Sequence, residues 1–349
     1  MRTFRAAILR HINNPLFTLI VRPENELQVG QVFVKVKCAT ICGAQIGEIT
    51  GAKGNDPYLP HLLGHEGAGI VQEVGPGVRY VSPGDHVVMH WRKGQGIDAV
   101  PAKYTTFFST DGEREVVGAG PVSTFSEYAI VSENRLTKIP NDVPFDIASL
   151  FGCAVTTGFG IINNEAKLKI GQDILVIGAG GVGLNVIYAA NIAGANEVIV
   201  CDNSKDKLVF STGFGITGVS KDLFDLEFNN TFFDVVVDCI GISSLIDRGL
   251  RRVKPGGKLV LVGQTVKDRC VSFSDFSQHY KGKTILDSQG GLTNPTEDIP
   301  RYIQMYDNGK LKKLYNIITD RYPLSEINTA FDRVKAGKVM GRCLITMEG

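Results

Sequence analysis

Short runs that alternate apolar and polar residues fill roughly the first 150 positions of the chain. Such alternation, interrupted by Gly and Pro, is typical of strands that bury one face of a sheet. The clearest runs are QVFVKVKCA (31–39), GAGIVQEVG (67–75), GDHVVMH (84–90) and SEYAIV (126–131). This pattern predicts an all-β domain of short strands.

From residue 171 the pattern changes. Residues 173–202, DILVIGAGGVGLNVIYAANIAGANEVIVCD, predict an apolar strand, a glycine turn, an amphipathic helix and a second strand. Two further continuous apolar runs, FDVVVDCIG (233–241) and GGKLVLVG (256–263), flank another helical stretch. Buried strands that alternate with helices indicate an α/β fold with a parallel sheet covered by helices, the doubly wound Rossmann arrangement.

The last 60 residues return to mixed elements. They predict a helix at 296–311, a strand near 315–324, a helix at 325–338 and a final apolar strand at 341–347. We therefore expect two domains, one made of residues 1–153 and 290–349, the other of residues 154–289. At 349 residues the chain is long enough for both to bury a core.

Composition and charge narrow the function class. Lys and Arg (37) nearly balance Asp and Glu (36), so the net charge is +1. This charge does not indicate binding to nucleic acid or to an anionic membrane. No apolar run approaches the ~18 residues of a membrane span, and the start turns polar too soon for a signal peptide. Seven cysteines, an odd number scattered along the chain, favour thiols in a reducing compartment, so we expect a cytoplasmic protein.

A dinucleotide site is predicted at VIGAGGVGLN (176–185). Gly178, Gly180 and Gly183 have the G-x-G-x-x-G spacing between a strand and a helix, although three-glycine turns also occur without a ligand. Asp202 ends the second strand, nineteen residues after Gly183, where a carboxylate can bind the adenosine ribose and repel a 2'-phosphate. Gly181 and Val182 begin the helix that would face the phosphates. The combination favours NAD over NADP.

A metal site is the second prediction. Cys42, His65 and Cys153 each lie among small residues, in ICGA, LGHEG and FGCAVTTG. Two thiolates and an imidazole leave zinc a fourth position for water or substrate, as in a catalytic site. Taken singly, a cysteine is more often an inert core thiol, and that is the role we expect for Cys38, Cys201, Cys239, Cys270 and Cys343.

Longer motifs resemble a known family. GHEGAGIVQEVGPGV, PGDHVV, STFSEYAIV, GCAVTTGFG and IGAGGVGLN are similar to segments of the zinc-dependent medium-chain alcohol dehydrogenases, in the same order and over essentially the whole chain. The resemblance implies a GroES-like β domain and a Rossmann domain with NAD between them. It also implies an enzyme in which zinc acts as a Lewis acid on the substrate hydroxyl and the hydride passes to NAD.

The resemblance assigns roles to individual positions. Cys42, His65 and Cys153 match the ligands of the catalytic zinc, and Glu66 matches an acidic neighbour that can approach the metal. Positions at the cofactor would be Thr157 beside the nicotinamide, Asp202 and Lys207 at the ribose, Arg342 near the pyrophosphate, and Val262. Trp91 and Phe125 would line the substrate pocket, although a plain core role is equally open for Trp91.

The sequence also departs from the family. Residues 90–125 contain no cysteine, so we expect one zinc per chain, no structural zinc, and a lobe held by side-chain packing alone. Ala44, Gln45 and Gly47 replace the usual hydroxyl, Asp and His that follow the first ligand. Gln45 would accept a hydrogen bond from the His65 ring. Protons would leave through water, with Glu48 or Glu66 as the carboxylate and His61 as a weaker candidate.

The resulting expectation is an NAD-dependent zinc alcohol dehydrogenase acting on a small, polar secondary alcohol such as a sugar, cyclitol or polyol derivative. A formaldehyde–glutathione activity is disfavoured because Gly43 lacks a side chain. The alternatives are a zinc-free NADPH quinone or enoyl reductase of the same superfamily, a non-catalytic NAD-binding homologue, and an enzyme within a larger assembly. We expect a homodimer, or a tetramer, paired through the strand near KGKTILDSQ (281–289).

Overall fold

The computed structural model describes residues 2–106, 114–222, 231–267, 270–275, 277, 280 and 282–347. The chain forms two compact units. The first consists of Met1–Cys153 with Asn294–Gly349, and the second of Ala154–Thr293. The second unit thus extends to residue 293 rather than the expected 289.

The first unit contains a closed barrel in which the strands follow the order β1-β2-β7-β8-β4. Its inside is apolar, and Phe4 and Tyr104 meet there edge to face with ring centroids 5.8 Å apart. The Tyr104 hydroxyl accepts a hydrogen bond from the Ile130 amide at 2.8 Å, so this buried polar group is satisfied. The strands are β1 (Phe4–Leu9), β2 (Phe17–Pro23), β4 (His61–Leu62), β7 (Lys103–Thr106) and β8 (Val116–Ala119).

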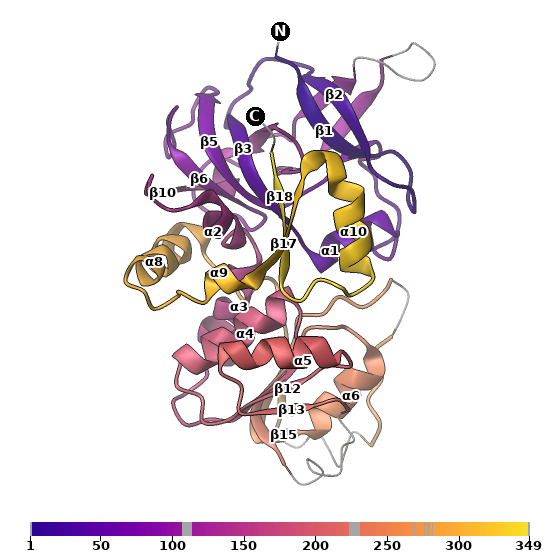
Figure 1. Ribbon diagram of the computed structural model, residues 1–349, viewed down its shortest axis with the longest axis vertical. Helices are drawn as coiled ribbons and strands as arrows, with labels where there is room; N and C mark the ends of the chain where they lie inside the picture. Colours follow the sequence, from indigo (N-terminus) through magenta and orange to yellow (C-terminus); the bar gives the residue numbers. More distant parts are fainter. Residues whose placement is uncertain are drawn as a thin grey trace. The chain divides into compact units, whose positions relative to one another are not determined.

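A second sheet of this unit runs in the order β10-β6-β5-β3-β18-β17, with β9 also paired to β3. Figure 1 shows the yellow β18, from the end of the chain, beside the indigo β3 from its beginning. The pair is antiparallel, whereas β17 and β18 are parallel. The strands are β3 (Gln31–Ile41), β5 (Glu66–Val74), β6 (His86–His90), β9 (Tyr128–Ser132), β10 (Leu136–Ile139), β17 (Ile318–Pro323) and β18 (Arg342–Thr346).

The first 150 residues consist mainly of strands, as expected. Two short helices lie among them, namely α1 (Gly43–Ile49) and α2 (Phe145–Leu150). The C-terminal part adds α8 (Pro295–Asp307), α9 (Leu314–Ile317) and α10 (Ile327–Lys335). Ile327 and Phe331 of α10 enter the same core as Phe125.

The lobe around residues 90–125 is not held by packing alone, which corrects the sequence-based expectation; residues 107–113 lie outside the described part. Glu133 is 1% exposed and its two carboxylate oxygens accept hydrogen bonds from three backbone amides. These are Arg79 (2.5 Å) and Tyr80 (2.9 Å) on Oε1, and Ile97 (2.8 Å) on Oε2. A carboxylate that accepts hydrogen bonds from the amides of separate loop segments links those segments to η1 (Glu133–Arg135).

We expect Glu133→Gln to lower the free energy of unfolding by about 1 to 3 kcal/mol. The amide end of glutamine turns an N–H group toward at least one backbone N–H, which leaves that buried donor unsatisfied. Urea unfolding measures the change, and the exposed Glu26 provides the matched control as Glu26→Gln. Equal unfolding midpoints for the two variants would show that the carboxylate does not anchor the lobe.

The second unit contains a parallel sheet in the order β13-β12-β11-β14-β15-β16. Numbered within the unit, this is the order 3-2-1-4-5-6 of the dinucleotide-binding fold. The strands are β11 (Ile174–Ile177), β12 (Val198–Cys201), β13 (Gly218–Ser220), β14 (Phe233–Asp238), β15 (Val253–Leu261) and β16 (Thr284–Asp287). The helices are α3 (Ala154–Gly160), α4 (Gly181–Ile192), α5 (Lys205–Ser211) and α6 (Ser243–Arg251).

Helix α4 was expected to be amphipathic, and this is wrong. Its residues are buried from Gly183 to Ala190. Helix α3 packs against it, and the Phe159 and Tyr188 rings meet edge to face with centroids 6.1 Å apart. A helix covered on both sides has no solvated face, so its sequence carries apolar residues all round.

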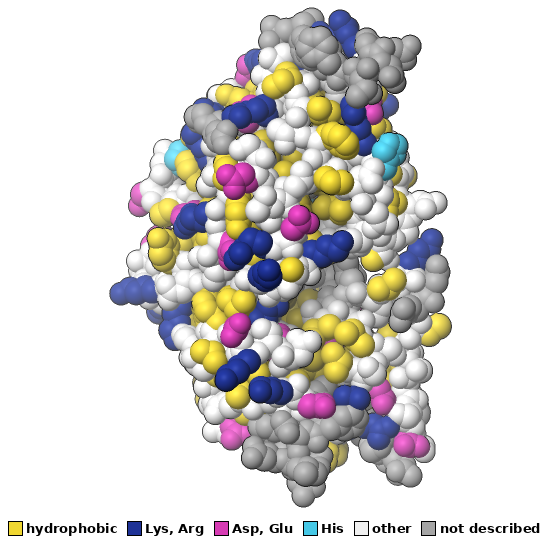
Figure 2. Space-filling model, turned by 45° about the vertical axis from the view of Figure 1, so that its right-hand side comes forward, with side chains coloured by type: hydrophobic (Ala, Val, Ile, Leu, Met, Phe, Trp, Pro, Cys, Tyr) yellow, Lys and Arg dark blue, Asp and Glu magenta, His cyan; other side chains and the backbone are white. Residues whose placement is uncertain are grey.

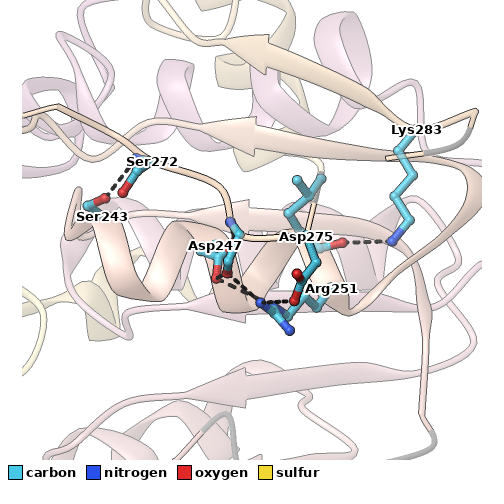
Figure 3. Close-up of polar contacts among 8 residues, drawn as sticks. Ser243, Asp247, Arg251, Ser272, Asp275 and Lys283 are labelled. Atoms are coloured by element: carbon cyan, nitrogen blue, oxygen red, sulfur yellow. Dashed lines mark hydrogen bonds and ion pairs between the residues drawn. The ribbon is translucent and has the colours of Figure 1, made fainter. Parts of the chain in front are cut away.

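Helix α6, in contrast, keeps a polar face that binds a later segment of the chain (Figure 3). Asp247 accepts hydrogen bonds from the Ser274 amide (3.1 Å) and from Arg251 Nε (3.4 Å). The Ser272 amide donates to the Ser243 hydroxyl at 3.2 Å. These exposed contacts hold the segment that follows β15 in place, although exposed ion pairs contribute little stability.

The surface fits the near-neutral composition. On the face shown in Figure 2, acidic and basic side chains are interspersed with apolar ones rather than gathered by sign. Among the described residues, no helix combines the length and apolar character needed to cross a membrane.

Candidate metal centre and dinucleotide site

Two neighbouring strands bring the first two predicted metal ligands together. Cys42 directly follows β3, and His65 directly precedes β5. The two strands are antiparallel, with Ala39 opposite Gly67, so the end of one meets the start of the other. Gly64 directly precedes His65 and has φ +103°, a conformation that favours glycine. A Cβ at this position would lie 2.3 Å from the Thr124 hydroxyl oxygen, so the absence of a side chain lets Thr124 pack against the backbone here.

The third predicted ligand arrives from a helix. Cys153 follows α2, which packs against β3 and β5. The candidate ligand atoms of Cys42, His65, Glu66 and Cys153 all lie within 4.8 Å of one another. His65 is half-buried and the other three are buried. Folding therefore gathers the residues that the sequence singles out from three distant segments.

The chemistry of these donors fits zinc. Two sulfurs and one imidazole nitrogen are preferred ligands of a tetrahedral zinc ion. The second carboxylate oxygen of Glu66 is buried and has no hydrogen-bond partner among the residues that the structure describes. A buried carboxylate oxygen left in this way is costly unless a cation approaches it. The donor set of the cluster therefore fits a metal ion.

The charged groups of the cluster shift one another's pKa values. A hydrogen bond from Cys153 and the nearby Arg342 hold the pKa of Cys42 well below its usual range. The same hydrogen bond and burial raise the pKa of Cys153, so Cys42 is the thiol that ionises more easily. Burial raises the pKa of Glu66, and the Arg342 guanidinium opposes this shift. A metal ion would displace the thiol protons and bind both thiolates.

Arg342, expected near the pyrophosphate, lies instead at the metal cluster. It begins β18, the strand beside β3, and is 3% exposed. Its Nη2 pairs with Glu66 Oε1 at 2.5 Å, and its Nη1 donates to the Ile41 carbonyl at 3.1 Å. Glu66 and the thiolates raise its pKa despite burial, so it stays charged. A contact with pyrophosphate stays a prediction.

Gln45 does not play the part expected of it. Its Oε1 accepts a hydrogen bond from the Cys42 backbone amide at 2.7 Å, not from the His65 ring. The expectation was wrong because Gln45 is the third residue of α1, where its side chain folds back onto the residue before the helix.

Two of the candidates for proton release, Glu48 and His61, each contact a side chain that can carry the opposite charge. Glu48 forms an ion pair with Lys53 at 2.9 Å, and its side chain is 28% exposed. The negative charge of Glu48 also acts on His65. Burial alone would lower the pKa of the His65 ring, but the Cys42 thiolate, Glu66 and Glu48 raise it. His61 Nδ1 lies 2.7 Å from Asp56 Oδ2.

The two residues expected to line the substrate pocket pack into cores. Phe125 is completely buried and contacts Phe331 edge to face, with ring centroids 5.6 Å apart. It is a core residue, because β-strand and α10 side chains surround it. Trp91 is half-buried against a second core and carries Arg92 over its ring at 5.8 Å. This agrees with the alternative of a plain packing role.

The glycine turn has the geometry that a pyrophosphate needs. Gly178 has φ +97°, and Gly183 approaches it so closely that an added Cβ would lie 1.9 Å from the Gly178 carbonyl oxygen. At Gly180 an added Cβ would meet nothing within 4 Å. Gly181 and Val182 form the first residues of α4. The turn therefore offers open backbone and a helix N-terminus to an anion.

Asp202 follows β12 and braces this turn. It is 7% exposed, and its Oδ2 accepts a hydrogen bond from the Ala179 amide at 2.8 Å. Its Oδ1 accepts from the Ser204 amide, also at 2.8 Å. Lys207 is half-buried on α5, Thr157 is 5% exposed on α3, and Val262 follows β15. Their contacts with a cofactor stay predictions.

One further acid at the carboxyl ends of the parallel strands was not predicted from the sequence. Asp238 ends β14, parallel and adjacent to β11, and is fully buried. It accepts hydrogen bonds from the Gly241 amide (2.9 Å) and the Ile240 amide (3.3 Å). Burial nevertheless raises its pKa to about 6. The sequence does contain a signal for this residue, because Asp238 is a charged residue directly after the apolar positions of FDVVVDCIG.

The raised pKa of Asp238 should make the free energy of unfolding depend on pH. The folded chain binds its proton more tightly than the unfolded chain, whose Asp titrates near 3.8, so stability is lost as pH rises from about 4 to about 6. Relative to wild type, Asp238→Asn should therefore gain about 2 kcal/mol between pH 4 and pH 7. Urea unfolding at both pH values measures this, and a difference that does not change with pH would contradict it.

Comparisons with known proteins agree with this site. The family model described as "Alcohol dehydrogenase GroES-like domain" matches residues 28–141, and "Zinc-binding dehydrogenase" matches residues 181–308. Two solved structures share the fold over the whole chain. These are a zinc-binding-domain alcohol dehydrogenase from Burkholderia ambifaria (TM-score 0.87, 24% identity, 100% of each chain) and benzyl alcohol dehydrogenase from Acinetobacter calcoaceticus (0.86, 23%, 100% of each chain).

Curated relatives match nearly end to end. The chain is 32% identical to S-(hydroxymethyl)glutathione dehydrogenase of Paracoccus denitrificans over 377 residues, covering 97% of this chain and 98% of that protein. It is 30% identical to alcohol dehydrogenase 2 of Oryza sativa subsp. japonica, covering 92% and 91%. The chain therefore belongs to the zinc-dependent medium-chain alcohol dehydrogenases, oxidoreductases that act on CH–OH groups.

Proposed function

We propose that this chain binds one zinc ion through Cys42, His65 and Cys153 and uses NAD to oxidise a polar secondary alcohol. The observation that carries the proposal is the cluster itself, in which two sulfurs, an imidazole and a carboxylate lie within 4.8 Å of one another. In the part of the chain that the structure describes, no second group of three or more His, Cys, Asp or Glu side chains has its ligand atoms this close together.

The residues around the cluster set its charge. Zinc bound here would supply a Lewis acid for the alcohol oxygen. Arg342, buried and paired with Glu66, balances part of the negative charge of the two thiolates and the carboxylate. The site would then stay near neutral with the metal bound, which limits the cost of burying so many charges.

For the cofactor, the chain supplies a turn and an acid. NAD would supply the hydride acceptor. The open backbone at Gly180 and the N–H groups that begin α4 would bind its pyrophosphate. Asp202, at the end of β12, would accept hydrogen bonds from ribose hydroxyls and repel a 2'-phosphate.

We expect Asp202→Asn to lower the preference for NAD over NADP by at least ~10-fold in kcat/KM. Asparagine can keep an oxygen for the Ala179 amide, although its NH2 group then faces the Ser204 amide and that hydrogen bond is lost together with the repelling charge. Steady-state kinetics with both cofactors measures the ratio. The exposed Asp206→Asn on α5 is the control, and an unchanged ratio in Asp202→Asn would refute the assignment.

The polar secondary alcohol is proposed from the residues after Cys42. Ala44 adds only a methyl group beside the ligand, which leaves room for a substituted carbinol carbon. Glu48, partly exposed on α1, offers a carboxylate to a substrate hydroxyl or to water that takes up the proton. Normal turnover in Glu48→Gln would remove Glu48 from that path.

A single screen tests the function. NADH formation is followed with sugars, cyclitols and polyols, with simple primary alcohols, and with S-(hydroxymethyl)glutathione, the compound in the name of the Paracoccus relative. We expect turnover with a polar secondary alcohol. Turnover with S-(hydroxymethyl)glutathione alone would overturn the substrate class. Zinc-free protein that reduces quinones with NADPH, or NAD binding without turnover, would overturn the function.

The same proposal includes a homodimer, with a tetramer as the larger alternative. Strand β16 lies at the edge of the parallel sheet, with Thr284 and Asp287 exposed and the two residues between them half-buried. An edge strand leaves backbone groups that a second copy can pair with. Light scattering after size-exclusion chromatography gives the mass, and a monomer at micromolar concentration would contradict this part.

A further inference from the structure

One peptide group at the metal cluster is held by side chains at both of its polar atoms. It is the group that joins Ile41 to Cys42, between the end of β3 and the start of α1. Its carbonyl oxygen accepts a hydrogen bond from Arg342 Nη1 at 3.1 Å. Its N–H donates to Gln45 Oε1 at 2.7 Å. The plane of the peptide before the ligand cysteine is thus fixed from two directions.

Gln45 is itself firmly placed. Its side chain is 0% exposed, and its backbone amide donates to the Cys42 carbonyl oxygen at 3.1 Å. Cys42 has an extended backbone (φ −102°, ψ 148°) and precedes the first helical residue, so helix hydrogen bonds do not serve its N–H. Without Gln45 Oε1 this buried donor would lose its acceptor.

The other end of the Gln45 side chain makes no hydrogen bond that would account for a glutamine at this position. Its Nε2 is buried and has no hydrogen-bond partner among the described residues. Burying an unpaired amide N–H costs about 1 to 3 kcal/mol, which an apolar residue of the same length would avoid. A glutamine here therefore contributes through the bond that its oxygen makes to Cys42.

The backbone of Cys42 in turn decides where its sulfur lies. Once φ and ψ are fixed, the direction of the Cα–Cβ bond is fixed, and only one torsion angle remains. A metal ligand must be held to within about 0.5 Å for the site to keep its geometry. The residue that follows the cysteine, Gly43, has no side chain, and Gln45 and Arg342 supply the side-chain hydrogen bonds to the peptide that precedes it.

We propose that Gln45 is a positioning residue for the zinc ligand Cys42, holding the Ile41–Cys42 peptide through its Oε1 together with Arg342. The inference rests on the proposed zinc site. It differs from a histidine-orienting role, because the bond reaches the backbone of one ligand rather than the ring of another.

Two variants of the whole chain distinguish the effect of the Gln45 oxygen from that of its nitrogen. Gln45→Met keeps the length but removes the acceptor oxygen, and Gln45→Glu keeps an acceptor at the same place but removes Nε2. Zinc release into a chromophoric chelator gives the rate of metal loss. Absorption of the cobalt(II)-substituted proteins reports the thiolate ligands directly, through the thiolate-to-cobalt band in the near ultraviolet.

We expect Gln45→Met to release zinc about 10- to 100-fold faster than wild type and to shift the thiolate-to-cobalt band. Gln45→Glu keeps the acceptor but adds a buried negative charge, so it should release zinc more slowly than Gln45→Met and keep the thiolate-to-cobalt band nearer to that of wild type. Far-ultraviolet circular dichroism and unfolding of the chelator-treated proteins check the fold. If Gln45→Met does not fold, Gln45→Asn replaces it, because its amide is one methylene too short to reach the Cys42 N–H.

The outcomes separate two failures. Wild-type protein that binds no zinc overturns the proposed function itself. Zinc in the wild type with an unchanged release rate and cobalt spectrum in Gln45→Met, or in Gln45→Asn in its place, overturns only the positioning role. Faster release in Gln45→Glu, equal to that in Gln45→Met, shows that the acceptor oxygen is not the operative group and also overturns the inference.

Discussion

Cys42→Ala is expected to lose its zinc and to lower kcat/KM for alcohol oxidation by ~1000-fold or more. Cys42 is one of the three ligands proposed for zinc, and its sulfur has the lowered pKa that a metal thiolate needs. Losing the Lewis acid removes several kcal/mol of transition-state stabilisation, and about 4 kcal/mol corresponds to a thousandfold change in rate. Elemental mass spectrometry of protein purified without chelator gives the zinc content per chain.

The matched control is Cys38→Ala. Cys38 lies on β3, the strand that Cys42 follows, and is also buried, but burial raises the pKa of its thiol to about 12, as expected of an inert core cysteine. This variant should keep its zinc and its activity while losing some stability from the small cavity. Zinc retained in Cys42→Ala, or lost equally in both variants, would contradict the assignment of the ligand.

Gly183→Ala is expected to disrupt the second unit and to abolish NAD binding. An alanine Cβ would lie 1.9 Å from the Gly178 carbonyl oxygen, so strand β11 and helix α4 would have to move apart. Both contacts lie in a close-packed interior, where overpacking costs about 1 to 3 kcal/mol or more. Thermal unfolding and titration of the nucleotide by calorimetry measure the two consequences.

Gly180→Ala separates folding from binding. An added Cβ at Gly180 meets no atom within 4 Å, and its φ of −80° suits any residue. We expect an unchanged unfolding temperature and an NAD dissociation constant raised by about 10-fold or more, because the methyl group would stand where the pyrophosphate approaches the backbone. Unchanged binding in Gly180→Ala would place the pyrophosphate elsewhere, and normal unfolding of Gly183→Ala would refute the steric argument.

Much of the second unit could be predicted from local pattern. Continuous apolar runs separated by helices are confirmed as a parallel sheet, because a strand buried on both faces needs no polar alternation. The glycine spacing of Gly178, Gly180 and Gly183 predicts the turn for the same local reason. The error lay in α4, which was expected to keep a polar face, because the sequence does not show that α3 covers it.

The first unit was harder to predict in detail. The membership of the family is confirmed, and the structure gathers Cys42, His65 and Cys153 in one cluster. The partners of these residues were not predictable. Gln45 reaches the Cys42 amide instead of His65, and Arg342 reaches Glu66. Likewise, Glu133 anchors a lobe that was expected to be held by packing alone.

By itself, the sequence determined the α/β class, the glycine turn with its acid, and the residue types of a zinc site. Each depends on a local period or spacing that any fold containing the segment must express. Only the tertiary structure decided which buried polar groups face one another. The register that sets Cys343 opposite Ile41 joins segments about 300 residues apart, and it places Arg342 beside Cys42 and Glu66. Such pairings follow from the packing of whole strands, because a hydrogen bond needs its partner within about 3 Å, and no local pattern records that distance.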